Sequence, residues 1–220
     1  MKVIITGATG MVGKGVLLEC LQNNTISEIL VINRASLHIK HPKLKEIIHT
    51  NFLDFSPIKE QLKGFNACFH CMGVSSMGIS DENYYNLTYT ATKNLAEILL
   101  ENNPEMVFIY VSGQGTDSSE QGKINWANVK GKTENMLFKI GFKDTYAFRP
   151  GAIIPGKGIK SKTPWINLML LLFKPFYGIL KKLDSVTTSE NIGKAMINCV
   201  KFSSEEKILE NRNINKMAKK

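Results

Sequence analysis

Three glycines near the N-terminus have the spacing of a phosphate-binding turn. Gly7, Gly10 and Gly13 follow the short apolar run of residues 3–5 and precede a stretch with the apolar periodicity of a helix. Gly7 would form the tight turn, Gly10 would let the backbone approach a pyrophosphate, and Gly13 would let the helix pack closely against the strand. The start of such a helix offers free N–H groups and a positive dipole end to phosphates. The strand, glycine turn and helix together predict a dinucleotide-binding site.

A basic residue follows the second predicted strand. Residues 29–33 form the continuous apolar run typical of a buried parallel strand, and this run ends at Asn33 and Arg34. An NAD site usually has an Asp or Glu here for the ribose 2′-hydroxyl, and this sequence has neither. The guanidinium of Arg34 can instead pair with a 2′-phosphate, and Lys14 adds positive charge after the last glycine. We therefore expect NADP(H) to be preferred over NAD(H).

The rest of the chain alternates predicted strands with predicted helices. Further strands are expected at residues 46–52, 66–71, 106–111 and 146–149, and helices at residues 81–102, 126–140 and 190–202. This alternation predicts an α/β fold of the Rossmann-like type, a doubly wound parallel sheet with helices on both faces. A single NAD(P)-binding domain is expected over residues 1–220, with a small lid or substrate-cleft segment at about 155–188.

Residues at the ends of the predicted strands would complete the cofactor site. Asn51 and Phe52 stand at the end of the third strand, where an adenine ring would lie. Cys71, Met72 and Gly73 follow the fourth strand, and Gly73 would leave room for the cofactor.

Two of the four cysteines have the spacing of a redox or zinc pair. Cys68 and Cys71 lie in a predicted strand, on which positions three apart point to opposite faces. No second pair of ligands is present for zinc. We therefore expect reduced, structural cysteines and no metal site. Because the N-terminal apolar run is also too short for a secretory signal peptide, we expect a cytoplasmic protein.

The chain has a formal net charge of +9, with basic residues gathered at residues 157–162, 181–182 and 216–220. A net positive charge of this size is typical of proteins that bind an anionic cofactor, an acidic membrane surface or nucleic acid. Nucleic acid is not an expected partner, because no recognised nucleic-acid-binding motif is present. The apolar stretch within residues 155–183 is broken by Lys174 and Pro175, which makes it too short to span a bilayer. It could be a lid, a homodimer contact or a weakly bound element at an anionic membrane surface, and a monomer or homodimer is expected.

Several motifs, taken in chain order, resemble the short-chain dehydrogenase/reductase superfamily in its atypical branch. The chain is similar to the HIV Tat-interacting oxidoreductase-like and NmrA-like group. The motifs that carry the resemblance are Thr6–Gly13, Asn33-Arg34, Cys71–Gly73, Ser112-Gly113, Lys130–Glu134 and Phe148–Gly151. The resemblance implies cofactor contacts by Thr9, Met11 and Val12 in the first motif, and by Lys130 and Pro150. It also implies catalytic roles for Lys130 and, as a weaker candidate, for Ser112.

The sequence departs from this superfamily at the position that matters most for catalysis. The resemblance implies a Tyr-x-x-x-Lys pair, in which the tyrosine exchanges a proton while hydride moves and the lysine lowers the tyrosine pKa and binds the nicotinamide ribose. Here Trp126 stands four residues before Lys130. An indole N–H donates a hydrogen bond but is not a usable acid near neutrality. Trp126 could still stack on a substrate ring or on the nicotinamide.

No replacement acid is assigned from the sequence. The candidates are Tyr84, Tyr85, Tyr110 and His70. Two main functions stay open: an NADP(H)-dependent oxidoreductase or epimerase-like enzyme on an unknown small carbonyl or hydroxyl substrate, and a non-catalytic NADPH-binding sensor or regulator. A peripheral membrane-binding protein is a third, less favoured hypothesis.

Overall fold

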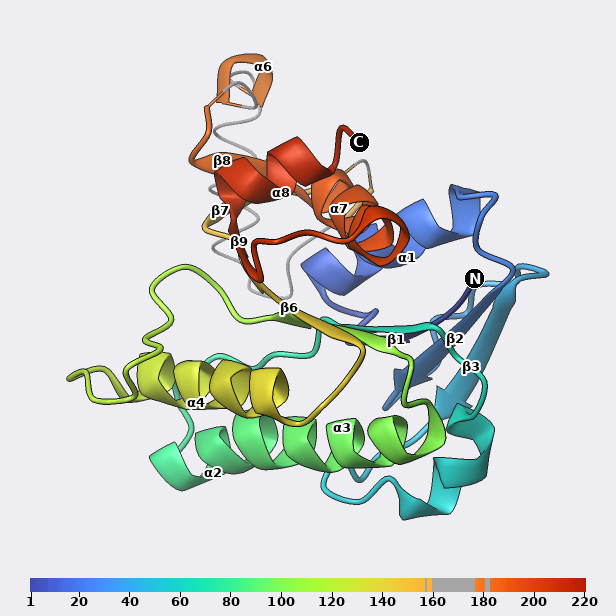
Figure 1. The fold of residues 1–220 in the computed structure, drawn as a ribbon, viewed down its shortest axis with the longest axis horizontal. Helices are drawn as coiled ribbons and strands as arrows, with labels where there is room; N and C mark the ends of the chain where they lie inside the picture. The colour runs from blue at the N-terminus through green and yellow to red at the C-terminus, as the bar shows by residue number, and fades with distance from the viewer. Residues whose placement is uncertain (157, 160–176, 181–182) are drawn as a thin grey trace.

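A seven-stranded parallel sheet forms the centre of the computed structural model (Figure 1). The structure describes residues 1–156, 158–159, 177–180 and 183–220. The strands lie in the order β3-β2-β1-β4-β5-β6-β9, and all neighbouring pairs are parallel. Their bounds are β1 Lys2–Thr6, β2 Glu28–Asn33, β3 Leu44–Ile48, β4 Ala67–His70, β5 Val107–Val111, β6 Asp144–Arg149 and β9 Ile208–Glu210. The direction of winding reverses between β1 and β4, which is where such sheets bind ligands beyond the carboxyl ends of their strands.

Helices cover both faces of this sheet, as Figure 1 shows. One face carries α1 (Met11–Gln22), α7 (Ser189–Phe202) and α8 (Asn211–Met217). The other carries α3 (Ala91–Asn102), α4 (Asn125–Lys139) and the 3₁₀ helix η1 (Ser56–Leu62). The predicted doubly wound α/β fold is therefore confirmed.

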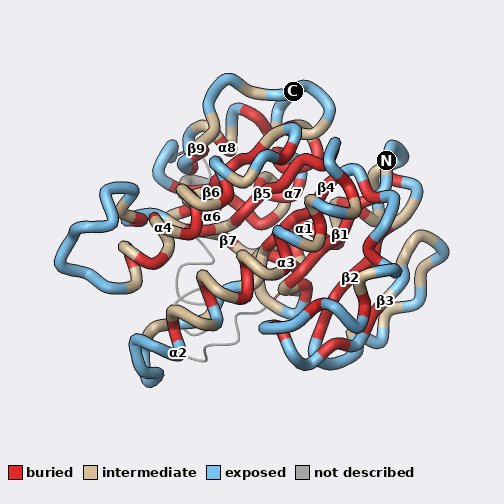
Figure 2. The backbone as a smooth tube through the Cα atoms, turned by 60° about the horizontal axis from the view of Figure 1, so that its bottom comes forward, coloured by how far each residue is buried: buried red, intermediate tan, exposed pale blue. Residues whose placement is uncertain are grey.

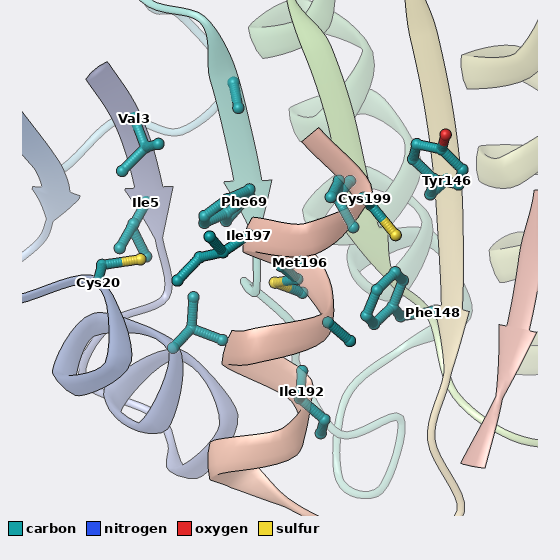
Figure 3. Packing of buried hydrophobic residues seen from close by; sticks show 14 of the residues in the cluster. Val3, Ile5, Cys20, Phe69, Tyr146, Phe148, Ile192, Met196, Ile197 and Cys199 are labelled. Atoms are coloured by element: carbon teal, nitrogen blue, oxygen red, sulfur yellow. The ribbon is translucent and has the colours of Figure 1, made fainter. Parts of the chain in front are cut away.

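The sheet divides the apolar interior into two cores, and buried residues follow the strands through the centre of the molecule (Figure 2). On the face of α7, Ile192, Met196 and Ile197 pack into the core that also holds Phe69 and Phe148 (Figure 3). Helix α7 lies directly against α1 because glycines stand at their contact. A Cβ added to Gly15 would lie 2.4 Å from the Ser189 Cβ, so a larger residue there would push the helices apart.

The predicted helix over residues 81–102 is confirmed, but it is not α-helical throughout. It begins at α2 (Asp81–Tyr85), where the Ser80 hydroxyl caps the helix by accepting from the Asn83 N–H. A π-helical turn, η2 (Asn86–Thr90), then joins α2 to α3. Such turns are rare and frequently occur at functional sites.

Several boundaries differ from the sequence prediction. The third strand ends at Ile48 rather than at residue 52, because Asn51 leaves the sheet in a turn in which its side chain accepts from the Leu53 N–H. The prediction missed β9, helix α8 and the parallel pair β7 (Ala152–Ile154) and β8 (Val186–Thr188). Most of the expected lid falls on residues 157, 160–176 and 181–182, which lie outside the described residues, whereas residues 177–180 form the short helix α6 (Tyr177–Leu180).

Candidate functional site

A cavity of about 300 Å³ opens at the carboxyl edge of the sheet, beside the point where the winding reverses. Its walls come from the end of β2 and from the segments that follow β1, β2, β3 and β4, with one residue from η2. The lining residues are Gly7, Thr9, Gly10, Ile32, Asn33, Arg34, Thr50, Asn51, Phe52, Leu53, Cys71, Met72, Gly73, Val74 and Leu87. This placement is the one that doubly wound folds use for ligands.

The glycine turn has the geometry that the spacing predicts. Gly7 has φ +72°, and an added Cβ would lie 2.6 Å from the backbone of Cys71 and Met72. A Cβ on Gly13 would lie 2.3 Å from the Gly7 carbonyl oxygen. The turn is closed by a hydrogen bond of 2.9 Å from the Gly10 N–H to that same oxygen. Larger residues at Gly7 and Gly13 would therefore separate β1, β4 and α1.

The N-terminus of α1 opens beside this cavity and is suited to an anion. Gly10 occupies the N-cap position and offers no side chain to the first N–H groups of the helix. The first turn also contains no acidic residue. Backbone N–H groups without a capping side chain, together with the helix dipole, favour a phosphate at this position. These residues fit the pyrophosphate of a dinucleotide.

Two cations near the cavity have no ion-pair partner in the part of the chain that the structure describes. Arg34 is exposed and lines the cavity, and Lys14 is a partly buried residue in the first turns of α1. Among the described residues that line this cavity there is no carboxylate. The local charge therefore favours an anionic group over a neutral hydroxyl.

The structure brings most of the predicted cofactor residues together. Nine of them line the cavity: Gly7, Thr9, Gly10, Arg34, Asn51, Phe52, Cys71, Met72 and Gly73. Met11, Val12 and Gly13 form the adjoining first turn of α1. Ile32, Asn33, Thr50, Leu53, Val74 and Leu87 also line it, although the sequence reasoning did not select them as contacts. The positions of Asn33 and Thr50 near the ends of predicted strands could have indicated that they line the cavity. No sequence signal pointed to Leu87, which reaches the cavity from the π-helical turn η2.

The remaining predicted residues meet at a second place, around the loop that follows β5. Gly113 has φ +125°, and a Cβ built on it would lie 3.6 Å from the Lys130 Nζ and 3.9 Å from the Pro150 carbonyl oxygen. The Lys130 ammonium donates to the Ser112 carbonyl, and the Gln114 N–H donates to the Pro150 carbonyl at 3.0 Å. Burial lowers the pKa of Lys130, and the nearby Glu134 carboxylate opposes this shift. The loop is thereby tied to α4 and β6.

The Ser112 hydroxyl is buried rather than presented to a cleft. It lies 2.5 Å from a Glu134 carboxylate oxygen, to which it donates, and 3.2 Å from the Phe148 carbonyl. Glu134 also binds Arg149, whose Nε donates to it at 3.0 Å and whose terminal nitrogen forms a second, shorter bond. That terminal nitrogen of Arg149 donates to the Ser118 hydroxyl as well, at 2.5 Å. Glu134 and Arg149 form a buried ion pair beneath the loop that carries Ser112 to Ser118, a contact that sequence reasoning missed.

Trp126 stands at the start of α4 and is partly buried. Its ring packs against the loop, because a Cβ on Gly115 would lie 3.2 Å from the indole. The Lys130 Nζ lies 5.9 Å from the centroid of the ring. The tryptophan therefore occupies the space beside Lys130 without supplying an ionisable group.

Three of the four alternative acids lie in the core. Tyr84 and Tyr110 are each 2% exposed, and burial raises the pKa of both. His70 is fully buried, and burial lowers its pKa to about 3. Its ring lies between the hydroxyls of Thr6, at 2.8 Å, and Thr92, at 3.1 Å. These three side chains are enclosed by the core and are not accessible to a substrate.

The fourth candidate, Tyr85, is partly exposed on α2, next to Tyr89 and Lys132. Its ring packs against Tyr89 in a tilted arrangement with centroids 5.0 Å apart, and the Lys132 ammonium lies 5.2 Å from each ring centroid. Lys132 is two residues beyond Lys130 on α4, so the two lysines point to different sides of that helix.

The cysteine pair is separated as the strand periodicity predicts. Cys68 packs in the core on the α3 face of the sheet, whereas Cys71 packs against the core on the α1 face. Burial raises the pKa of the Cys71 thiol to about 12, so this group is protonated where it lines the cavity. The thiolate form that redox chemistry and metal binding need is therefore disfavoured.

A larger hollow of about 610 Å³ lies elsewhere, over residues 202–207 and α8 at the amino edge of β9. It mixes Lys207, Lys216 and Lys220 with Glu205 and Glu206, so it has no uniform charge for one class of ligand. The cavity at the carboxyl edge combines a glycine turn, a helix start and unpaired cations, and it is the better candidate site.

Among the helices that the structure describes, none has the length and apolarity needed to cross a bilayer.

Comparison with known proteins identifies the family of this chain. The family model described as "NAD dependent epimerase/dehydratase family" matches residues 3–128, which is more than half of the chain. The chain is 27% identical over 164 residues to Protein FMP52, mitochondrial, of Debaryomyces hansenii, covering 74% of this chain and 70% of the relative. It is 24% identical over 181 residues to Protein HTATIP2 of Rattus norvegicus, covering 81% of this chain and 71% of that relative.

One expectation from the sequence is overturned by these relatives. The FMP52 proteins of Debaryomyces hansenii, Candida albicans and Emericella nidulans are all named as mitochondrial. This points away from the cytoplasmic location that the short N-terminal run and the reduced cysteines suggested.

Solved structures show the same fold. The UDP-N-acetylglucosamine 4-epimerase of Methanobrevibacter ruminantium M1 superposes with a TM-score of 0.70 at 15% identity, covering 95% of this chain and 75% of the epimerase. The Bordetella bronchiseptica enzyme WbmF, solved in complex with NAD+, has a TM-score of 0.69 at 15% identity, covering 99% of this chain and 76% of WbmF. The sheet order, the glycine turn and the match over residues 3–128 agree, and the chain belongs to the NAD dependent epimerase/dehydratase family.

Proposed function

We propose that this chain binds NADP(H) in the carboxyl-edge cavity and acts as an oxidoreductase or epimerase-like enzyme on a small carbonyl or hydroxyl substrate. When bound, the nicotinamide would donate or accept a hydride. The observation that carries the proposal is the cavity itself. It joins an uncapped helix start at Gly10 to an unpaired Arg34, and no carboxylate lines it.

The preference for NADP(H) rests on Arg34. In this fold, the residue after the second strand lies next to the ribose of the adenosine half. A guanidinium there can form a bidentate pair with a 2′-phosphate, whereas it gains little from a 2′-hydroxyl. Lys14, in the first turns of α1, would add positive charge near the phosphates of the cofactor.

The second cluster would hold the nicotinamide half. Lys130 is fixed by its bond to the Ser112 carbonyl, and the Pro150 carbonyl approaches Gly113 closely. The positive φ of Gly113 and the absence of a Cβ leave the backbone open beside the Lys130 ammonium. The role of Lys130 would be to bind the ribose of that half.

A second candidate function is an NADPH-binding sensor or regulator without catalysis. The specific observation in its favour is Trp126, which packs on Gly115 where the superfamily has its tyrosine. The core positions of Tyr84, Tyr110 and His70 strengthen it, because these groups cannot reach a substrate without unfolding of their surroundings.

Calorimetric titration with NADPH and NADH tests the cofactor proposal. We expect NADPH to bind at least tenfold more tightly than NADH, which corresponds to about 1.4 kcal/mol. Arg34→Ala should remove most of this difference by weakening NADPH alone. Arg212→Ala is a matched control, since Arg212 is exposed on α8 and pairs with Asp184 at 3.5 Å. Equal affinities in the unmodified chain would refute the NADP(H) preference.

The two candidate functions are separated by Trp126→Tyr, with Trp126→Phe as the aromatic control. Each protein would be assayed for NADPH oxidation against a panel of small aldehydes and ketones. Turnover by the unmodified chain supports the enzyme and refutes the sensor. Turnover by Trp126→Tyr alone supports the sensor, because it shows a complete site that lacks only the acid.

A further inference from the structure

Glu46 holds the segment that carries Arg34. It lies on the edge strand β3, opposite Val31 in the parallel register, and its side chain is partly buried. Its carboxylate accepts three hydrogen bonds, all from residues 33–37. Oε1 accepts from the Asn33 amide at 3.3 Å and from the Leu37 N–H at 2.9 Å, and Oε2 accepts from the Ser36 hydroxyl at 2.6 Å.

These three bonds fix the segment on both sides of Arg34. Asn33 is the last residue of β2 and is 3% exposed, so it is a rigid anchor. Ser36 and Leu37 lie beyond Arg34, in irregular backbone that continues to His38 with φ +54°. Since one carboxylate binds both sides, residues 33–37 form a closed loop with Arg34 near its middle. Hydrogen bonds to a charged acceptor are the stronger kind, and three of them limit the freedom of this loop.

The same hydrogen bonds stabilise the ionised form of the Glu46 carboxyl. Burial tends to raise the pKa of the Glu46 carboxyl, but the hydrogen bonds from Ser36, Leu37 and Asn33 outweigh burial and keep the pKa below its ordinary value. The carboxylate is thus ionised and fully engaged by the loop, and it is absent from the cavity lining. Arg34, by contrast, has no partner among the described residues.

We propose that Glu46 is a specificity-determining positioning residue, which presents Arg34 to the 2′-phosphate of NADP(H) by closing the loop of residues 33–37. This inference rests on the proposed function. Because Glu46 is not among the described residues that line the cavity, it would act through Arg34 rather than by contact with the cofactor.

Titration of variants with NADPH and with NADH tests this role. Glu46→Ala should weaken NADPH binding about tenfold and change NADH binding less than threefold. Glu46→Gln keeps one accepting oxygen and should recover part of the NADPH affinity. Glu28→Ala is the matched control, because Glu28 lies on the neighbouring strand and its ion-pair partners among the described residues are Lys2 and Lys45, at 3.2 and 2.9 Å. It should leave both affinities unchanged.

A double variant shows whether Glu46 works through Arg34. In the Arg34→Ala background, Glu46→Ala should cause no further loss of NADPH affinity, because residues that act as one unit are not additive. An equal loss for both cofactors, or an undiminished effect in that background, would show a purely structural role and overturn the inference. If Glu46→Ala does not fold, Ser36→Ala removes one of the three bonds and should shift the preference in the same direction.

The outcomes also separate this inference from the function on which it depends. An unmodified chain without NADPH preference refutes both. A clear NADPH preference that persists in Glu46→Ala and Ser36→Ala refutes the positioning role alone and leaves the cofactor proposal intact.

Discussion

Removal of the Glu134 carboxylate should destabilise the chain strongly. Its side chain is 0% exposed and that of Arg149 is 13% exposed, so Glu134→Ala would leave a nearly buried guanidinium without its counter-charge. Loss of one partner from a buried pair costs about 3–5 kcal/mol. The Ser112 hydroxyl would also lose its shortest hydrogen bond. Because Arg149 retains slight exposure and the Ser118 hydroxyl, we expect a loss near the lower limit, about 3 kcal/mol.

Thermal unfolding followed by circular dichroism measures this effect. For a chain of this size, 1 kcal/mol shifts the melting temperature by about 2–4 °C, so Glu134→Ala should melt about 6–12 °C lower. Glu101→Ala is the control: Glu101 is 65% exposed and pairs with Lys59 on the surface, and its loss should cost less than about 1 kcal/mol. The double variant Glu134→Leu with Arg149→Met removes both charges and should recover much of the stability.

Two results would refute this reasoning. A loss of less than about 1 kcal/mol in Glu134→Ala would mean that water reaches Arg149 readily, so that the pair resembles a surface ion pair. A double variant as unstable as the single one would mean that packing volume, rather than the unpaired charge, determines the cost.

Two further predictions concern the glycine turn and a buried histidine. Gly13→Ala places a methyl group 2.3 Å from the Gly7 carbonyl oxygen, so it should cost about 1–3 kcal/mol in a melting experiment and weaken NADPH in titration; a variant with unchanged stability and affinity would contradict the close approach. His70 has a folded-state pKa of about 3, lowered by burial from its ordinary 6.5, so the unfolded chain takes up this proton first as pH falls. The contribution of neutral His70 to the free energy of unfolding is fully present above about pH 6.5. Between about pH 6.5 and pH 3 it falls by about 1.4 kcal/mol per pH unit. Denaturant titrations at several pH values should show a shallower pH dependence for His70→Gln than for the unmodified chain, and equal slopes would contradict this assignment.

The local part of the cofactor site was predictable from the sequence because neighbouring residues determine it. The spacing of Gly7, Gly10 and Gly13 specifies a turn whose geometry depends on few other residues. The apolar run before Arg34 indicates a buried strand, and the end of such a strand lies at the ligand edge of the sheet. These inferences need no knowledge of which strands pair.

Contacts between distant residues could not be predicted in the same way. Glu134 and Arg149 both stood in recognised motifs, yet their pairing depends on how α4 packs against β6. Burial of the Ser112 hydroxyl depends on the same packing. The strand β9 has only three residues, and so short an apolar run has no readable period. The π turn that brings Leu87 to the cavity depends on a shift in backbone hydrogen bonding, and no residue type in this segment predicts that shift.

The proposed cofactor cavity and the cluster around Lys130 belong to different elements of this fold. The cavity is lined by the turn between β1 and α1, the end of β2 and the segments after β2, β3 and β4, whereas Lys130 and Trp126 belong to α4 and pack on the loop after β5. Under the proposed function, a substitution at position 126 would change the chemistry beside the nicotinamide without disturbing the turn at Gly7 or the position of Arg34. This separation explains why an enzyme and a sensor would share the same cofactor residues in this chain. It also means that NADPH affinity, however tight, does not discriminate between them, and that turnover by the unmodified chain and by Trp126→Tyr is the deciding comparison.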